Sequence, residues 1–496
     1  MDGSESPGFS AEAQIGYLEM QDYVSKIDYQ KSLALVPELL ALGSSNPKII
    51  ETRDPNLLTS PTDATVIAGT VADVLAPTLH AYVLYVLRDA ERRGVKTLYF
   101  LARDAYFMYL YAKKYTEQYH LHVKCRYLCV SRYSLRIPLY HKNIDRALDF
   151  ITLGGLDVTP RKLLNRTGIQ GKDRDNLLGD FYKVFGWEPD DQIPRDHLPL
   201  VKVFLKKNAL FSKCMFEIST EAYPKLVGYL KENDFFQRES IAIVDSGWVG
   251  SIQESLKTIR QEYVRNVRFE GYYFGLYEIP KKVNPMNYHT YYFDPDSSLK
   301  RKVGFSNCVF EGVYSAPHGM TVGYERKDGH WVPVFAPISE RRKNYYKALE
   351  SIYMKHLELL LAKNYGFKEL CSMFSSAKAN MMIERNLTSF MTKPSEDEAR
   401  IFGRMDFSDD VVEYQGNVMA AEMSEKELKE NHFVNRVLQD LELKLTGIKP
   451  VIKQSAWYEG SAILYSSGFK RAKHLASYKA YKYFLQYKKR QRYQNK

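Results

Sequence analysis

The sequence predicts an α/β protein built on a doubly wound, mainly parallel sheet, with a helical insertion, a small β-hairpin region and C-terminal helices. The first observation is a set of short runs rich in β-branched and aromatic residues, which are typical of strands. The second is that a helical pattern follows such a run, and a similar run comes next along the chain. Strand–helix–strand crossovers are right-handed and make neighbouring strands parallel. The predicted strands span residues 97–102, 123–130, 241–244 and 267–277.

A chain of 496 residues is long enough for two or three compact units. Changes in composition along the chain divide it into five regions. They are an N-terminal arm (1–65), an α/β core (66–300) with a helical insertion at about 143–239, a β-hairpin extension of the core (301–340), a helical region (341–450), and a strand-like segment with a basic amphipathic tail (451–496).

The first elements are helical. Two helices are plausible in the arm, around residues 11–27 and 29–41. Residues 66–93 have apolar side chains at four-residue spacing, so they predict a longer helix. Pro77 lies inside this helix and is expected to kink or divide it. Gly94 follows as the expected C-terminal stop.

The region 301–340 reads as short β runs separated by turns. Asp328 and Gly329 stand between residues 322–324 and 331–334, and an Asp-Gly pair between β runs predicts a hairpin. Further on, the sequence AILY at residues 462–465 predicts a short strand.

Ten of the positive charges lie between Lys470 and Lys496, a stretch without an acid, whereas the net charge of the whole chain is +11. The basic character therefore belongs to the tail and not to the fold. Aromatic residues interleave with the lysines, which suits a helix on an anionic membrane surface through residues 469–496. The alternative is a solvated tail. A nucleic-acid partner is not expected, because no known nucleic-acid-binding module is recognised.

Five scattered cysteines (Cys125, Cys129, Cys214, Cys308 and Cys371) form no paired metal-binding pattern and fit reduced thiols. The polar start of the sequence has no signal-peptide pattern, and no apolar run is long enough to cross a membrane. We therefore expect a cytoplasmic protein, either free or at the inner face of the membrane.

Polar residues gather where three of the predicted strands end, and parallel strands bring such ends to one edge of the sheet. Glycines there let the backbone approach a bound group, and a helix N-terminus offers free N–H donors to an anion. Arginines suit phosphate or carboxylate groups. The predicted ligand-binding residues are Arg103, Ser131, Arg132, Arg136, Ser246, Gly247, Trp248, Gly250 and Ser251.

Asp104 and Asp245 are the predicted catalytic residues. They could act as general base and partner, or share a divalent cation such as Mg²⁺. Asp104 could instead be the N-cap of the following helix. Trp248 is either a platform for a sugar or base, or a lid on the core. Glu311 and His318 could reach the pocket, but a core or surface role is expected for both.

The common phosphate-binding, dinucleotide, zinc-protease and nucleophile-elbow motifs are not found. The stretch DSGWVGS at residues 245–251 is loosely similar to the acidic loop of phosphoribosyltransferases, without its second adjacent acid or its Thr-Gly pair. A phosphoribosyltransferase-like enzyme is therefore one alternative.

Five blocks occur in a fixed order: YFLARDAYFMY, CRYLCVSRYSLRIP, LGGLDVT, VDSGWVGSIQESL and FEGVYSAPHGMTVGY. Together they resemble a bacterial family labelled predicted hydrolases of the HAD (haloacid dehalogenase) superfamily, associated with cell-surface polysaccharide gene clusters. The resemblance covers roughly residues 66–340. HAD phosphatases use a D-x-D motif after a strand, and neither Asp104 nor Asp245 begins one. The resemblance thus implies the α/β domain and the polysaccharide context, but no phosphatase nucleophile.

The expected function is that of a protein of surface-polysaccharide synthesis that binds a phosphorylated sugar or a nucleotide-sugar-like ligand. As an enzyme it would be a hydrolase or a transferase acting on a phosphate-containing group. A second expectation is a non-catalytic, membrane-peripheral scaffold or regulator of glycan synthesis.

Overall fold

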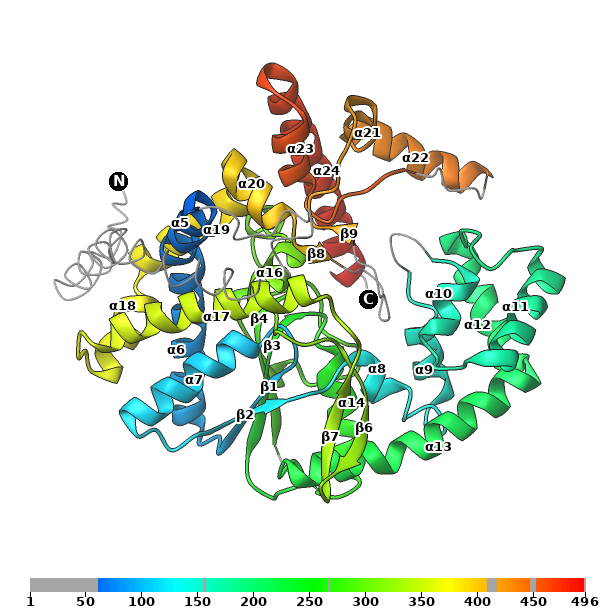
Figure 1. Ribbon diagram of the computed structural model, residues 1–496, viewed down its shortest axis with the longest axis horizontal. Helices are drawn as coiled ribbons and strands as arrows, with labels where there is room; N and C mark the ends of the chain where they lie inside the picture. The colour runs from blue at the N-terminus through cyan, green and yellow to red at the C-terminus, as the bar shows by residue number, and fades with distance from the viewer. Residues whose placement is uncertain (1–60, 155–157, 266–267, 408–416, 447–451, 495–496) are drawn as a thin grey trace, which may run out of the picture.

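The computed structural model describes residues 61–154, 158–265, 268–407, 417–446 and 452–494. The two helices expected around residues 11–27 and 29–41, and nearly all of the N-terminal arm, lie outside the described residues. The described chain is an α/β structure with a parallel sheet at its centre and many helices around it (Figure 1).

The central sheet has five strands in the order β2-β1-β3-β4-β5, and every neighbouring pair is parallel. Four of these strands were predicted from the sequence, whereas β5 was missed. The tyrosines and the histidine in β5 lack the β-branched run that marks β3. The bounds are β1 (Thr97–Leu101), β2 (Lys124–Leu128), β3 (Ile241–Trp248), β4 (Phe269–Leu276) and β5 (Tyr288–Phe293).

Strand β3 does not stop at Asp245, as the sequence suggested, but continues through Trp248. Its pairing with β4 extends to Gly247 opposite Gly275 and Trp248 opposite Leu276. Asp245, Ser246 and Gly247 therefore lie within β3, whereas Gly250 and Ser251 lie at the start of α14. Pairing with β4 holds this segment extended, even though its sequence resembles a loop.

Side chains alternate between the two faces of the sheet, so each face has its own apolar core. Leu98 and Phe100 point into a core shared with helices α6 (Ala76–Arg93) and α7 (Tyr106–Tyr119). Tyr99 and Leu101 point into a second core, shared with α13 (Ala209–Glu232) and α14 (Ser251–Gln261). Helices thus cover both faces.

Between β2 and β3 the described chain is helical and has an apolar core of its own. Figure 1 shows these helices to one side of the sheet, with the long α13 leading back to it. The first helix, α8, follows the end of β2 and carries Arg132 and Arg136. The segment comprises α8 (Arg132–Arg136), α9 (Ile144–Ile151), α10 (Pro160–Asn165), α11 (Gly171–Phe185), a 3₁₀ turn (Arg195–His197), α12 (Leu198–Lys207) and α13.

The predicted first helix is divided, as the position of Pro77 suggested. Helix α5 (Pro61–Thr70) passes through a π-helical turn (Val71–Leu75) into α6, where the proline occupies the first turn. Gly94 ends α6 with φ 70°, a left-handed conformation that glycine adopts without strain. The stretch Asp63–Arg93 is long and apolar enough to cross a membrane, but 89% of its most apolar window is buried inside the protein. It is a core helix of the fold.

The predicted hairpin is present as β6 (Thr321–Lys327) paired antiparallel with β7 (His330–Phe335). Asp328 and Gly329 form its turn with φ 51° and 83°, the positive angles that such turns require. The short β runs predicted just before the hairpin are wrong. That stretch forms two helices, α15 (Leu299–Val303) and α16 (Asn307–Tyr314), each opened by a serine N-cap that the sequence prediction overlooked.

The chain beyond the hairpin is almost entirely helical where it is described. The strand predicted at residues 462–465 is wrong, because these residues form the end of α23, where Ala462 and Ile463 are buried. The elements are α17 (Glu340–Leu361), α18 (Phe367–Ser375), α19 (Ala377–Thr392), α20 (Glu396–Gly403), the two-residue strands β8 (Asp406–Phe407) and β9 (Asn417–Val418), α21 (Glu425–Glu430), α22 (Phe433–Thr446), α23 (Tyr458–Tyr465) and α24 (Gly468–Gln494).

The basic tail forms the single helix α24, and one side of it packs on the rest of the protein. His474 and Tyr481 are buried, and the ring of Tyr478 stacks on Tyr458 with 4.0 Å between ring centroids. The tail is therefore a structural helix with a packed face and an exposed face, and not a free solvated segment.

Candidate functional site

The chain order of the sheet reverses between β1 and β3. From β1 the chain continues to β2 at one edge, and from β3 it continues through β4 to β5 at the other edge. In open α/β sheets, ligands bind beyond the carboxyl ends of the strands at such a switch point. Because Phe100 pairs with Val244, the residues that follow these two positions meet at this edge.

Asp104 and Ser246 are in direct contact there. The Ser246 hydroxyl donates to Asp104 Oδ2 over 3.1 Å. Asp104 is not the N-cap of α7, because the helix begins after Ala105 and has no side-chain cap. An N-cap role therefore does not explain this carboxylate, which instead contacts Ser246 on β3.

Three carboxyl groups, Asp104, Asp245 and Glu311, form a carboxylate cluster in which each interacts electrostatically with another member. Burial raises the pKa of Asp245 to about 7, and the nearby Asp104 adds to the rise. Burial also raises the pKa of Glu311 to about 8, again with help from Asp104. The pKa of Asp104 is raised by burial as well. All three residues are half-buried.

Positive charges surround the carboxylate cluster and limit these shifts. Arg103 lowers the pKa of Asp104 most strongly among them, and Arg132 and Arg342 act in the same direction. Burial lowers the pKa of Arg103, and Arg342 lowers it further. The first turn of α17 carries Arg342, more than 200 positions after Asp104. No sequence signal linked the two, so the sequence prediction missed this arginine.

Glu311 reaches the cluster from α16, and Trp248 positions it. The indole Nε1–H of Trp248 donates to Glu311 Oε1 over 2.5 Å. The Trp248 ring packs among aromatic side chains, with ring centroids 5.2 Å from Phe305 and 5.8 Å from Phe310. Trp248 therefore packs as a lid on the core, and Glu311 lies next to Asp104 in the candidate site.

An arginine cluster, Arg132, Arg136 and Arg146, lies beside the N-terminus of α14. Arg136 Nη2 donates to Ser251 Oγ over 2.8 Å, and Arg146 Nη2 donates to the Ser251 carbonyl over 3.5 Å. Burial and the charges of Arg132 and Arg146 lower the pKa of Arg136 to about 10. Arg146, from the insertion helix α9, was not predicted. Within the described part of the chain, none of the three arginines forms an ion pair with an acid.

Three predicted ligand-binding residues have structural roles that explain them. The Ser131 side chain caps α8 and donates to the Thr321 carbonyl over 2.7 Å. A Cβ at Gly247 would lie 2.3 Å from the Gly275 carbonyl oxygen, so this glycine allows strand pairing. A Cβ at Gly250 would lie 2.8 Å from the Tyr288 ring. Packing within the protein is thus sufficient to explain both glycines.

His318 lies at the border of the site. Its Nε2 shares a hydrogen bond of 2.8 Å with the Tyr127 hydroxyl, and its ring stacks on Phe335. Burial lowers the pKa of His318, and Arg103 lowers it slightly further. The imidazole is therefore neutral near pH 7 and packs as part of the hairpin contact.

Among the described residues, no group of three or more His, Cys, Asp or Glu side chains is arranged to hold a metal ion. Two carboxylates, Asp104 and Asp245, remain as donors for the predicted Mg²⁺. Such a pair fits Mg²⁺ only when the substrate supplies further oxygens, because Mg²⁺ is commonly bound through one or two carboxylates plus substrate phosphates.

Comparison with known proteins gives no assignment. No protein-family model matches the chain, and no curated protein matches it. The function is therefore inferred from the geometry of the carboxylate cluster and the arginine cluster.

Proposed function

We propose that this edge of the sheet binds a phosphorylated sugar or a nucleotide-sugar-like ligand and transfers or hydrolyses its phosphate-containing group. The observation that carries the proposal is the position of the arginine cluster, whose members form no close ion pair within the described residues, next to three carboxyl groups with raised pKa values. Arginines without close ion pairs at a helix N-terminus favour a phosphate. Carboxyl groups that titrate near neutral pH favour acid–base chemistry.

The arginines would bind the ligand, and the carboxyl groups would transfer protons. Arg136 and Arg146 would hold the ligand phosphate against Ser251, at the start of α14. Asp245, with a pKa of about 7, would take the proton of the attacking water or hydroxyl as the new bond to phosphorus or carbon forms. Glu311, with a pKa of about 8, would give its proton to the departing oxygen as the old bond breaks. Asp104 would help to raise the pKa of Asp245 and of Glu311, and Arg103 would lower the pKa of Asp104.

A divalent cation is part of the proposal. In the alternative to its role as base, Asp245 would bind Mg²⁺ with Asp104 and with oxygens of the ligand phosphate, because Mg²⁺ is commonly bound through one or two carboxylates plus substrate phosphates. The prediction is that Mg²⁺ binds weakly without the phosphorylated ligand and more tightly with it.

The position of the ligand site in the sheet and the role in surface-glycan synthesis are also part of the proposal. Treating the sheet as doubly wound, with the switch point between β1 and β3, supports a ligand site at their carboxyl ends. The five sequence blocks that resemble the polysaccharide-associated family support a role in bacterial surface-glycan synthesis on the cytoplasmic side. The phosphoribosyltransferase-like alternative would use the same arginines for a phosphoribosyl pyrophosphate.

A thermal-shift panel tests the proposal, because a ligand that binds only the folded state raises the melting temperature. The panel contains sugar phosphates, nucleotide sugars and phosphoribosyl pyrophosphate, each with and without Mg²⁺. A shift that Arg136→Gln and Arg146→Gln abolish supports the site, with Arg161→Gln in the insertion as the matched control. A panel without any shift would contradict the proposal, and a shift by phosphoribosyl pyrophosphate alone would favour the alternative.

A second candidate function, docking on an anionic membrane, is favoured by the surface of α22 and α24. Val434, Leu438 and Leu441 form an apolar stripe on α22 and are 61%, 56% and 48% exposed. Helix α24 lies beside the start of α22, where the rings of Phe433 and Phe484 approach to 5.6 Å. Its exposed face carries basic side chains and no acid. Apolar and basic surfaces side by side suit an anionic bilayer.

Point substitutions test membrane docking better than deletion of the tail, since deletion would uncover the packing partners of His474 and Tyr481. Leu438→Gln with Leu441→Gln should reduce sedimentation with phosphatidylglycerol vesicles. Lys473→Gln with Lys479→Gln should do the same. A matched control with substitutions at the exposed Lys363 and Lys368 should leave sedimentation unchanged. Equal sedimentation of all variants would exclude this candidate.

A further inference from the structure

A cavity of about 320 Å³ lies away from the carboxylate cluster, between α6, β5, α15, α18 and α19. Cavities of this size and larger are typical of small-molecule sites. Neither the acid–base chemistry nor the arginine cluster uses it, so the occupant must be inferred from the lining.

Polar side chains line the cavity together with apolar and aromatic ones. Leu84, Phe374 and Ile383 are buried and form part of the floor. Tyr85 and Tyr291 contribute partly exposed rings whose centroids are 5.6 Å apart. Apolar and aromatic surfaces of this kind accept a flat ring system, because stacking on an aromatic face tolerates any planar base.

The rim supplies a positive charge. Arg88 is exposed at the rim, and its Nη1 donates a hydrogen bond to the Ser375 hydroxyl, a neutral group, over 3.3 Å. Arg301, on the other side, is an ion-pair partner of Glu384. Within the described residues, Arg88 therefore keeps a charge that no carboxylate neutralises. A charged guanidinium that no carboxylate neutralises favours binding of a phosphate or carboxylate group.

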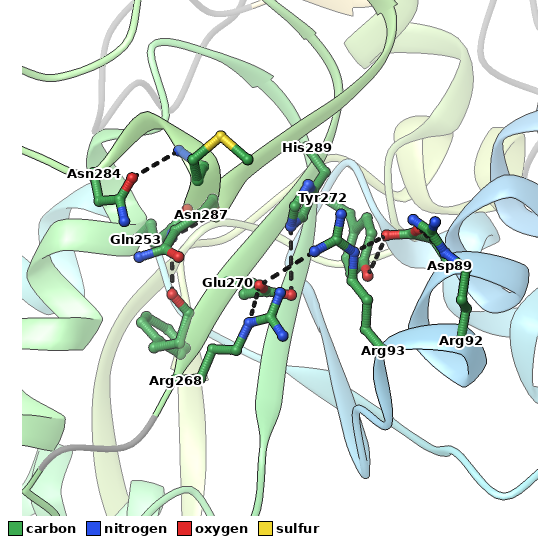
Figure 2. Close-up of polar contacts among 12 residues, drawn as sticks. Asp89, Arg92, Arg93, Gln253, Arg268, Glu270, Tyr272, Asn284, Asn287 and His289 are labelled. Atoms are coloured by element: carbon green, nitrogen blue, oxygen red, sulfur yellow. Dashed lines mark hydrogen bonds and ion pairs between the residues drawn. The ribbon is translucent and has the colours of Figure 1, made fainter.

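Ion pairs and hydrogen bonds join the end of α6 to β4 and β5 (Figure 2). At the end of α6, Asp89 accepts hydrogen bonds from Arg93 and from the Tyr272 hydroxyl, which belongs to β4. Glu270 on β4, which is fully buried, pairs with Arg93 over 3.8 Å and with His289 of β5 over 3.4 Å. Helix α6 and strand β5 thus hold the cavity open before a ligand arrives, which lowers the entropic cost of binding.

We infer that this cavity binds a mononucleotide, with the base against the Tyr85 and Tyr291 rings and the phosphate at Arg88. A nucleoside without phosphate leaves Arg88 without an anionic partner, and inorganic phosphate leaves the aromatic walls empty. Only a ligand with both parts uses the whole lining.

The cavity also has a structural connection to the candidate active site. Tyr82, one turn before Tyr85 on α6, donates its hydroxyl to the backbone carbonyl of Asp245 over 3.0 Å. Its ring lies 5.8 Å from the Tyr291 ring. The contacts from Tyr291 to Tyr82 and from Tyr82 to Asp245 thus link the cavity to the candidate active site.

Isothermal titration with uridine monophosphate tests the inference on four variants of the full chain. Arg88→Gln removes the rim charge, and Ser375→Trp places a large ring at the exposed rim. Each should weaken binding about tenfold or more. For Arg88→Gln the reason is the loss of a charge-assisted hydrogen bond, and for Ser375→Trp it is the large ring at the rim. Arg385→Gln, at an exposed position on α19, is the control and should bind like the unmodified protein. Arg136→Gln disables the arginine cluster and should leave this binding intact.

Uridine and inorganic phosphate are the two further probes. Each should bind at least tenfold more weakly than uridine monophosphate. The inference is overturned if uridine monophosphate does not bind, if Arg88→Gln and Ser375→Trp bind it normally, or if inorganic phosphate competes equally well. Loss of binding in Arg136→Gln alone would place the nucleotide at the arginine cluster. That result would overturn this inference while supporting the proposed function, so the two can fail separately.

Discussion

Ser246 and Asp104 are joined by a hydrogen bond of 3.1 Å although they lie 142 positions apart in the chain. The bond joins the ends of the adjacent strands β1 and β3 at the point where the strand order reverses. It also lowers the pKa of Asp104 against the rise caused by burial. The hydroxyl therefore adjusts the charge of the carboxylate cluster as well as its geometry.

The first prediction concerns this hydroxyl. Ser246→Ala should raise the pKa of Asp104, because burial then acts without the opposing hydrogen bond. We expect the acid side of the pH profile for ligand binding to move to higher pH. Ser255→Ala is the control: its hydroxyl is buried and has no hydrogen-bond partner among the described residues, so its removal should leave the profile in place. A profile that Ser246→Ala does not move would contradict this role.

The second prediction concerns stability and pH. The folded state keeps a proton on Asp245 up to about pH 7, whereas an unfolded aspartate loses it near pH 4. Between these values the folded state binds more protons, so the contribution of Asp245 to stability falls as the pH rises. Asp245→Asn should therefore be more stable than the unmodified protein at pH 8 and equally stable at pH 4. Urea unfolding at both pH values measures the difference, and a constant difference would contradict the raised pKa.

The third prediction concerns Trp248. Its indole N–H lowers the pKa of Glu311 against the larger effect of burial. Trp248→Phe keeps an aromatic ring in the cluster but removes the donor, so the pKa of Glu311 should rise above about 8. Carboxyl NMR titration with Glu311→Gln for assignment measures this value. An unchanged or lower pKa would show that the indole N–H does not act on Glu311.

The fourth prediction compares two glycines. Gly94 ends α6 with φ 70°, where a side chain is strained, so Gly94→Ala should destabilise the protein by about 1 kcal/mol. Gly179 lies within helix α11 with open space around its Cα, so Gly179→Ala should stabilise it by up to about 1 kcal/mol. Urea unfolding measures both variants. If both substitutions change the free energy of unfolding in the same direction, backbone conformation does not explain their effects.

The sequence was sufficient for the α/β class, four of the five central strands, the divided first helix and the hairpin turn. Each depends on local chemistry, such as β-branched runs, Pro77, Gly94 and the Asp328–Gly329 pair. It was not sufficient for the helices around Glu311 or for the AILY helix, since short apolar runs fit either a strand or a helix. Tertiary packing decides between the two.

Only part of the candidate site was predicted, because local sequence patterns mark some of its residues and long-range packing brings in the others. Arg103, Asp104, Arg132, Arg136, Asp245 and Ser246 follow strands, and strand ends can be found in a sequence. Arg146, Glu311 and Arg342 come from helices that long-range packing brings to the sheet, so no nearby pattern marks them. Gly247 and Gly250 pose the reverse problem, because glycines that allow packing look the same in a sequence as glycines that admit a ligand.

The strand order has a consequence for how the chain folds. Strand β1 sits between β2 and β3, and β3 is synthesised only after the whole helical segment α8 to α13. Until then one edge of β1 has no neighbour, and its backbone groups can pair with another chain. Refolding should therefore be slow and should aggregate at high protein concentration. Truncated chains that end within the insertion should be insoluble, whereas chains that extend beyond β5 should be soluble.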